Sequence, residues 1–260
     1  TEKLRPMSSY SDYDPFARVY NQHWGNHFIP LVFPILEDHV LRYIPPNSCI
    51  LDLCCGTGQL VRVLAGQGYQ VTGLDGSAEM LRFARENAPD SEFIMADART
   101  FEQPDTYQAV ISTFDSLNHI LELGELKSVF DNVRAALRPS GLFLFDLNME
   151  AGFKTDWNYD FNIVEDDHVC VIRSSYHPRE RRAKFEATIF SEGNVWQRSD
   201  FTLTQRCYSE PEVVETLKQA GFTEIQACAC DIKRDLIQLT TESERAFFIG
   251  RKPAGQWITD

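Results

Sequence analysis

The stretch Asp52-Leu53-Cys54-Cys55-Gly56-Thr57-Gly58 separates a short apolar run, Cys49–Leu53, from an amphipathic one, Gln59–Gln67. The first run has the length and composition of a buried strand, and the second has the periodicity of a helix. Glycines at alternate positions of the turn allow positive φ and let a ligand approach the backbone closely. The stretch therefore predicts a strand–turn–helix unit whose turn binds a ligand.

Short apolar runs alternate with helical patterns along the chain on both sides of this turn. Such alternation predicts a mostly parallel sheet with right-handed crossovers and helices on both faces. Two helices are expected between residues 14 and 44, and a hairpin of the last two strands is expected at one sheet edge. The α/β sheet would have seven strands, at Cys49–Leu53, Gln70–Leu74, Glu92–Met95, Ala109–Thr113, Leu142–Leu147, Glu224–Cys230 and Arg245–Arg251.

The alternation stops after Asn148. Three strand-like stretches follow, at Val164–Tyr176, Ala183–Ser191 and Val195–Tyr208, with turn signals between them. We expect an antiparallel β insertion, or cap, after the fifth strand. The chain would then divide into N-terminal helices over the ligand (1–44), a core (45–150 and 209–260) and the cap (151–208).

The charge balance narrows the classes of partner. Acidic residues outnumber basic ones by 38 to 25, and the formal net charge is −13. A phosphate backbone requires clustered Lys and Arg, so we expect a small-molecule substrate and no nucleic-acid partner. Nothing in the sequence specifies an oligomeric state.

Cysteine spacing and hydropathy indicate the compartment. The seven cysteines form neither an even disulfide framework nor paired C-x-x-C spacings, and free thiols are typical of a reducing compartment. No basic region followed by an apolar stretch is present at the N-terminus, and the apolar run 27–44 is interrupted by prolines and charges. We expect a cytoplasmic protein without membrane association.

Acidic residues end three consecutive predicted strands, at Asp52, Asp75 and Asp97. The carboxyl ends of parallel strands meet at one crevice, where such sheets bind ligands, and an acid after the second strand can bind both ribose hydroxyls. The dinucleotide fingerprint requires a small residue three positions after Gly58, where Val61 stands. The pattern favours a nucleoside ligand other than a dinucleotide.

These motifs together resemble the class I S-adenosylmethionine-dependent methyltransferases. The turn Asp52–Gly58 is similar to the first motif of that family, with Cys54 in place of its first glycine. The stretch Leu137-Arg138-Pro139-Ser140-Gly141-Leu142 resembles the family's turn before strand five. The resemblance implies a Rossmann-like fold, S-adenosylmethionine as cofactor and S-adenosylhomocysteine as product.

The resemblance also implies cofactor contacts. Asp52, Cys54, Gly56 and Gly58 would face the methionine moiety. Three residues would lie at the ribose (Asp75, Gly76, Ser77), three would lie at the adenine (Met80, Asp97, Ala98), and the backbone of two would bind the amino group (Thr113, Phe114).

Two further segments resemble the small-molecule branch of the family. Residues Tyr13–Tyr20 match its Y-D-x-x-A-x-x-Y opening, so Tyr13 and Tyr20 are candidates for cofactor contact, and Trp24 continues that face as a candidate substrate wall. The segment Phe114–His119 is similar to one in glycine N-methyltransferases and amino-sugar N,N-dimethyltransferases. His119 and Tyr13 are therefore the candidate catalytic residues, because an imidazole can accept a proton at neutral pH.

Substrate contacts are expected beyond strand five and in the cap. Asn148 would hydrogen-bond a substrate amine or carboxylate, and Arg173 or Arg206 would pair with a substrate anion. No metal ligand set is expected.

The sequence leaves two functions open and disfavours a third. Methyl transfer to a small molecule is favoured, with nitrogen slightly ahead of oxygen as acceptor because the nearest resemblances are N-methyltransferases. A non-catalytic S-adenosylmethionine-binding module has the same acids, so the sequence does not separate it. A nicotinamide-dependent oxidoreductase is disfavoured, because its glycine fingerprint and catalytic Tyr-x-x-x-Lys are absent from the sequence.

Overall fold

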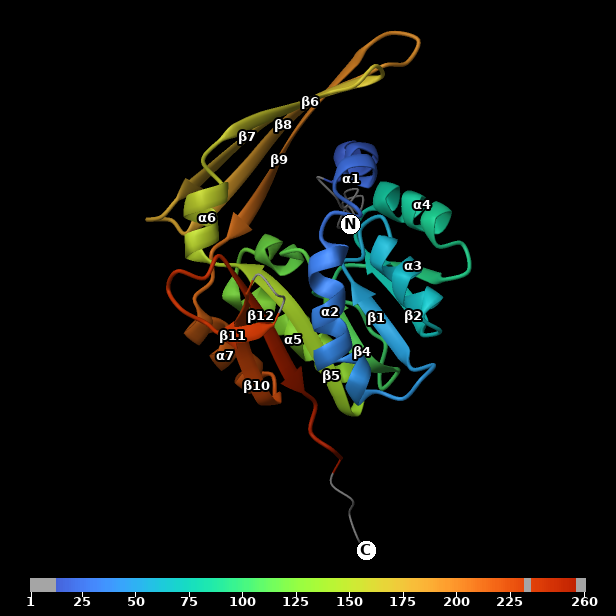
Figure 1. Cartoon of the computed structure of the whole chain (residues 1–260), viewed down its shortest axis with the longest axis vertical. Helices are drawn as coiled ribbons and strands as arrows, with labels where there is room; N and C mark the ends of the chain where they lie inside the picture. The colour runs from blue at the N-terminus through green and yellow to red at the C-terminus, as the bar shows by residue number, and fades with distance from the viewer. Residues whose placement is uncertain (1–12, 232–234, 256–260) are drawn as a thin grey trace, which may run out of the picture.

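The fold is known from a computed structural model that describes residues 13–231 and 235–255. Two sheets dominate it, a large one in the core and a smaller one that projects from it (Figure 1). The helices are α1 (Ala17–His23), α2 (Ile29–His39), α3 (Gln59–Gly66), α4 (Ala78–Asn87), α5 (Leu123–Ala136), α6 (Glu150–Asp156) and α7 (Glu210–Gln219). Short 3-10 helices cover Asp14–Phe16, Leu41–Tyr43 and Ser116–His119.

The core sheet confirms the expected mostly parallel α/β architecture. Its order is β11-β10-β12-β5-β4-β1-β2-β3, and the neighbours from β5 to β3 run parallel. The strands are β1 (Cys49–Leu53), β2 (Gln70–Asp75), β3 (Glu92–Met95), β4 (Tyr107–Ser112), β5 (Leu137–Asn148), β10 (Thr223–Cys230), β11 (Leu236–Gln238) and β12 (Arg245–Arg251).

The described sheet has eight strands instead of the predicted seven. The extra strand, β11, is a three-residue edge strand that pairs antiparallel with β10. Such a short segment carries too few residues to show a period, so sequence patterning passes over it. The expected antiparallel pairing of the last two predicted strands is present as β10 and β12, and it differs only in that β11, which lies between them in the sequence, forms the outermost strand beside β10.

Strand β5 begins five residues before the predicted position. Its first residue, Leu137, pairs with Tyr107, and the register shifts before Ala109. Ser140 has φ 66°, and its N–H donates to the Lys252 carbonyl. The Pro-Ser-Gly segment is therefore an irregularity within the strand, although its composition is typical of a turn.

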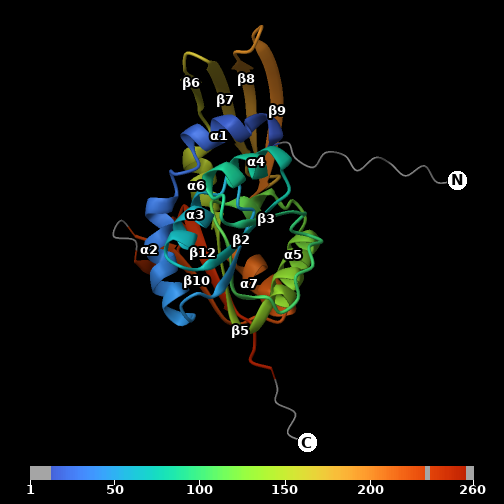
Figure 2. The ribbon, with the colours of Figure 1, turned by 90° about the vertical axis from the view of Figure 1, so that its right-hand side faces the viewer.

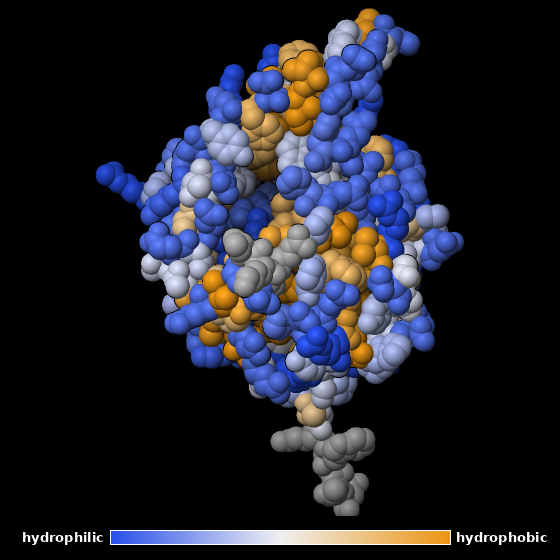
Figure 3. All heavy atoms as spheres, viewed as in Figure 1, coloured by the Kyte–Doolittle hydropathy of each residue, from blue (hydrophilic) through white to orange (hydrophobic). Residues whose placement is uncertain are grey.

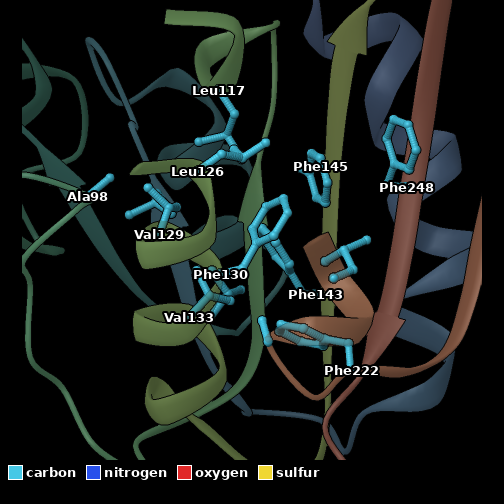
Figure 4. Close-up of a cluster of buried hydrophobic side chains, with 14 of the residues drawn as sticks. Ala98, Leu117, Leu126, Val129, Phe130, Val133, Phe143, Phe145, Phe222 and Phe248 are labelled. Carbon is cyan, nitrogen blue, oxygen red and sulfur yellow. The ribbon is translucent and has the colours of Figure 1, made fainter. Parts of the chain in front are cut away.

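Helices cover both faces of the core sheet. The side chains of α5 and α7 pack on one face, where stacked phenylalanines form the centre of a buried cluster (Figure 4). Phe143, Phe145 and Phe248 follow one another there at centroid distances of 4.7 and 5.1 Å. Helices α2 and α3 pack on the other face. This two-sided burial holds the strand ends rigidly at one edge, where the candidate ligand site lies.

The cap has four strands and a helix, where the sequence predicted three strands. Its antiparallel order is β6-β7-β8-β9, with β6 (Asp160–Val164), β7 (His168–His177), β8 (Arg182–Ser191) and β9 (Gln197–Arg206). The strands β7, β8 and β9 correspond to the predicted three, and the turns fall at the predicted signals. Strand β6 and helix α6 were missed, because each is short and largely exposed.

The N-terminal segment lies between the cap and the core. Helix α1 runs under the cap strands and beside α4, as the two perpendicular views show (Figures 1 and 2). Asn21 of α1 accepts hydrogen bonds from Gln59 and Asn87, each at 2.7 Å. Because Asn87 also donates to the Thr57 carbonyl, these amides join the N-terminal segment to the turn that begins α3.

Candidate active site

A cavity of about 750 Å³ lies between the carboxyl ends of the core strands, the N-terminal segment and the cap. Its volume is within the range that small-molecule sites occupy. In the space-filling view a hollow opens between the cap and the core, and hydrophobic side chains of the cap lie above it (Figure 3). All three parts of the chain contribute to its lining.

The turn after β1 forms a close-fitting backbone cradle. Cys54, Gly56 and Gly58 all have positive φ, at 62°, 54° and 77°. A Cβ at Gly56 would lie 3.4 Å from the Tyr20 ring, and one at Gly58 would lie 2.9 Å from Ala84 of α4. Glycine is therefore required at Gly58 by packing, while at Gly56 it opens the turn toward Tyr20 and the cavity.

Asp75 is held by backbone N–H groups from two turns. Its carboxylate accepts from Gly56 N and Ser77 N, each at 2.9 Å. Burial raises the pKa of Asp75, and these N–H groups counteract part of the rise. Ser77 in turn accepts from Met80 N and donates to Asp14 of the N-terminal segment at 2.5 Å. The acid is thus fixed at the cavity wall with a defined orientation.

Asp52 lies behind the lining, not in it. Its side chain is buried in the core sheet, and no cavity-lining atom comes from it. Burial, together with the charge of Asp75, raises the pKa of Asp52 to about 8. At neutral pH its carboxyl is therefore largely protonated until a positive charge approaches.

Asp97 lines the cavity and is already engaged by an arginine. The Arg99 guanidinium donates to both Asp97 oxygens, at 2.9 and 2.6 Å, and also to Glu125 at 3.0 Å. These hydrogen bonds lower the pKa of Asp97. Arg99 also lines the cavity, and the sequence did not point to it.

The loop after β4 is strained and braced. Phe114 and Asp115 have φ 64° and 51°, which non-glycine residues rarely adopt. The Asp146 carboxylate accepts from both of their N–H groups, at 2.7 and 3.0 Å, and it also pairs with Arg245. Arg245 donates to Asp115 at 2.8 Å and lies over the Phe28 ring. This network presents the loop to the cavity in one conformation.

His119 and Tyr13 are in direct contact. The Tyr13 hydroxyl lies 2.8 Å from His119 Nε2, and His119 Nδ1 lies 3.1 Å from the Thr204 carbonyl of β9. A carbonyl only accepts, so Nδ1 carries the proton and Nε2 accepts from Tyr13. Gln205 Nε2 also approaches Nε2, at 3.1 Å, and donates to Asp115 at 2.7 Å. Burial raises the pKa of Tyr13 well above its usual value, so the phenol stays protonated.

Most of the predicted site residues meet at this one cavity. Those that line it are Tyr13, Tyr20, Trp24, Cys54, Gly56, Asp75, Gly76, Met80, Asp97, Ala98, Phe114, His119 and Asn148. Four others are not part of its lining, namely Asp52, Gly58, Ser77 and Thr113. The Thr113 carbonyl accepts from the Ser116 hydroxyl.

The two cap arginines do not face the cavity, which corrects the expectation that they pair with a substrate anion. Arg173 borders a separate hollow of about 300 Å³, and Arg206 pairs with Glu212 and the Leu121 carbonyl. Successive side chains of a strand point to opposite faces, and their neighbours Ser174 and Gln205 take the inward positions.

Sequence patterns missed several lining residues. Arg245 and Gln205 carry no local motif, and their partners at the cavity, such as Asp115 and His119, lie far from them in the sequence. The aromatic residues of the cap, such as Trp157 and Phe185, are indistinguishable from core residues in the sequence. Asp115 had a usable signal, because it stands within the segment that resembles the family loop.

Within residues 13–231 and 235–255, no group of three or more His, Cys, Asp or Glu side chains is placed to hold a metal ion. In the same ranges, no helix is long and apolar enough to cross a lipid bilayer.

The cavity suits S-adenosylmethionine. The turn after β1 would hold the methionine part against its backbone, the Asp75 carboxylate would accept from the ribose hydroxyls, and Asp97 and Ala98 would contact the adenine. Buried Met80 lies on the same wall as an apolar surface for a flat ring. The donor set therefore fits the cofactor that the motifs imply.

Comparison with known proteins agrees with this assignment. A family model described as "Methyltransferase domain" matches residues 50–141. The putative methyltransferase YqeM of Bacillus subtilis (strain 168) is 30% identical over 250 residues, covering 92% of this chain and 97% of that protein. A dTDP-3-amino-3,6-dideoxy-alpha-D-glucopyranose N,N-dimethyltransferase of Streptomyces fradiae is 32% identical over 149 residues, 55% of this chain and 56% of that protein.

Solved structures share the fold at lower identity. An S-adenosylmethionine-dependent methyltransferase from Clostridium acetobutylicum ATCC 824 has a TM-score of 0.76 at 22% identity, covering 94% of this chain and all of that one. Streptomyces venezuelae DesVI has a TM-score of 0.72 at 20% identity, covering 94% of this chain and 99% of that one. The chain therefore belongs to the class I S-adenosylmethionine-dependent methyltransferases.

Proposed function

We propose that this enzyme transfers a methyl group from S-adenosylmethionine to a nitrogen atom of a small molecule. The observation that carries the proposal is the Tyr13–His119 contact at the wall of the cavity. The sulfonium supplies an activated methyl group when the cofactor is bound. The protein's remaining tasks are then to align the acceptor and to take its proton.

The Tyr13–His119 pair is suited to that proton transfer. The Tyr13 oxygen can accept a hydrogen bond from an incoming amine while its own proton is directed at His119 Nε2. As the new N–C bond forms, the amine proton passes to Tyr13 and the Tyr13 proton to His119. Because Thr204 fixes the proton on Nδ1, the imidazole is oriented with its basic nitrogen toward Tyr13.

Asn148 completes the polar end of the proposed acceptor site. It lines the cavity at the end of β5, and its backbone N–H donates to Asn118 at 2.9 Å. Its side-chain N–H donates toward the Gln205 side-chain oxygen at 3.5 Å, which supports a role for the Asn148 side-chain oxygen in accepting a hydrogen bond from a substrate amine.

His119→Ala tests the proposal. The variant should lose turnover by about 10²-fold or more, the scale of one general base, while its affinity for S-adenosylhomocysteine changes by less than about threefold. Turnover is measured as S-adenosylhomocysteine formed with a panel of amines, amino sugars and hydroxy acids. Affinity is measured by titration calorimetry.

The same panel separates the alternatives. Products formed with hydroxy acids but not with amines would assign oxygen as acceptor and overturn the nitrogen proposal. Tight cofactor binding without turnover on any class would favour a binding module. An unchanged kcat in His119→Ala would remove the imidazole from the mechanism.

A further inference from the structure

The cap side of the cavity is walled by aromatic rings that lead away from the Tyr13–His119 pair. Ring centroids are separated by 6.4 Å from Tyr13 to Phe16, 5.6 Å from Phe16 to Phe185 and 6.3 Å from Phe185 to Trp157. All four rings line the cavity. Such a wall favours flat apolar or aromatic groups of a ligand.

A second row of rings faces the same space. Trp24 lies 5.1 Å from Phe16 and 6.0 Å from Phe161, and Tyr159 lies 5.7 Å from Phe161. Tyr159 is about half exposed, although a large apolar ring normally avoids water. The two rows together form an aromatic arm of the cavity, and this arm is longer than an acceptor amino group alone would occupy.

The arginines on the lining are already neutralised. Arg99 is paired with Asp97 and Glu125, and Arg245 is paired with Asp115 and Asp146. An entering diphosphate would have to compete with two carboxylates at each guanidinium. The cavity is therefore electrostatically unfavourable for a multiply charged anion.

A carboxylate stands at the far end of the aromatic arm. Asp156 ends α6, precedes Trp157 and lines the cavity. Among the residues that the structure describes, no side chain or backbone group forms a hydrogen bond or ion pair with the Asp156 carboxylate. An exposed carboxylate beside aromatic rings is a favourable place for an organic cation.

We propose that the acceptor is a cationic molecule with an aromatic or apolar body, and not a nucleoside diphosphate sugar. The nitrogen to be methylated lies at Tyr13 and His119, the body lies along Phe16, Phe185 and Trp157, and a cationic group faces Asp156. This inference rests on the proposed function and specifies the substrate class of the same site. It separates this chain from the dTDP-sugar enzymes that it resembles.

Binding of three probes to protein saturated with S-adenosylhomocysteine tests the inference by calorimetry. Tryptamine presents an aromatic body and a cation, indole-3-propionate presents a similar body with an anion, and thymidine diphosphate presents two phosphates. Tryptamine should bind at least about tenfold more tightly than indole-3-propionate, because one charge is reversed beside Asp156. Thymidine diphosphate should bind more weakly than tryptamine.

Variants assign the preference to particular side chains. Asp156→Asn should weaken tryptamine binding about three- to fivefold, the scale of one exposed charge pair, and leave indole-3-propionate no weaker. Trp157→Ala should weaken both indoles. Asp160→Asn is the matched control, because Asp160 lies four residues further on and outside the lining, and it should change neither.

Two results would overturn the inference. One is tighter binding of thymidine diphosphate than of tryptamine to the wild-type protein, and the other is an equal affinity for both indoles that Asp156→Asn does not change. The affinity for S-adenosylhomocysteine, measured in the same samples, shows that each variant is folded. If the wild-type protein does not bind S-adenosylhomocysteine, that result counts against the proposed function and not against the substrate class.

Discussion

At the residue scale, the pKa values of two carboxyl groups near the cavity shift in opposite directions. Asp97 is held ionised by Arg99, whereas burial and Asp75 raise the pKa of Asp52 to about 8. A raised pKa means that folding is opposed by ionisation: stability of the ligand-free protein falls as pH rises from the ordinary carboxyl range toward 8. Asp52 of β1 is therefore largely uncharged at neutral pH in the ligand-free protein, and a cationic ligand nearby would favour its ionisation.

Cofactor affinity should consequently depend on pH through Asp52. S-adenosylmethionine carries a sulfonium and an ammonium group, which lower the pKa of a nearby carboxyl, so binding at pH 7 should release a proton. The association constant should rise with pH up to about 8, by at most about tenfold per unit for one proton, and level off above it. Calorimetry in buffers of different ionisation enthalpy measures the proton count.

Two asparagine variants control this pH experiment. Asp52→Asn should remove the dependence on pH, because the titrating group is gone. Asp97→Asn should change the affinity but keep the slope, since Asp97 is ionised throughout this range. Binding without proton release in the wild-type protein would show that Asp52 does not respond to the cofactor.

At the scale of elements, the site depends on how closely α3 and α4 approach. Gly58 directly precedes α3 and has φ 77°. A Cβ built on Gly58 would lie 2.9 Å from the Cβ and 3.0 Å from the Cα of Ala84 in α4. Gly58→Ala should destabilise the protein by about 2–4 kcal/mol, through backbone strain and overpacking together. Thermal and urea unfolding measure the loss.

Gly66→Ala is the matched substitution at the other end of the same helix. No atom lies within 4 Å of a Cβ built there, and its φ is not positive. Alanine should raise the stability slightly, by up to about 1 kcal/mol, because it lowers the entropy of the unfolded chain. Equal effects of the two substitutions would contradict the packing argument for Gly58.

Elements with a strong period or a motif could be predicted from the sequence, and elements defined by distant partners could not. The five parallel strands and the acids at Asp52, Asp75 and Asp97 follow from local patterns that burial and ligand chemistry impose. Strand β6 and helix α6 expose much of their surface, so they show little hydrophobic period. Arg206 was placed wrongly because a single position decides which face of a strand a side chain occupies.

At the scale of the whole molecule, three parts close around one cavity, and the N-terminal segment connects the other two. Asn21 ties it to the core through Gln59 and Asn87. On the other side, His23 ties it to the cap through His168, at 3.1 Å between the Nε2 atoms. Arg18 of α1 also pairs with Asp167 of the cap. Opening the cavity must break the contacts on one of these two sides, so the rate of cofactor exchange should depend on them.

His23→Ala should accelerate cofactor exchange. His168 Nδ1 donates to Asp167 at 2.6 Å, so its Nε2 accepts the His23 hydrogen, and alanine leaves this buried acceptor without it. Loss of about 1 kcal/mol, one hydrogen bond, corresponds to S-adenosylhomocysteine dissociating about fivefold faster in stopped-flow displacement. Asn26→Ala is the control, since the Asn26 side chain accepts one exposed hydrogen bond, from Arg62 at 3.4 Å, and has no other hydrogen-bond partner among the described residues. Equal release rates in the two variants would mean that exchange does not pass through the junction of α1 and the cap.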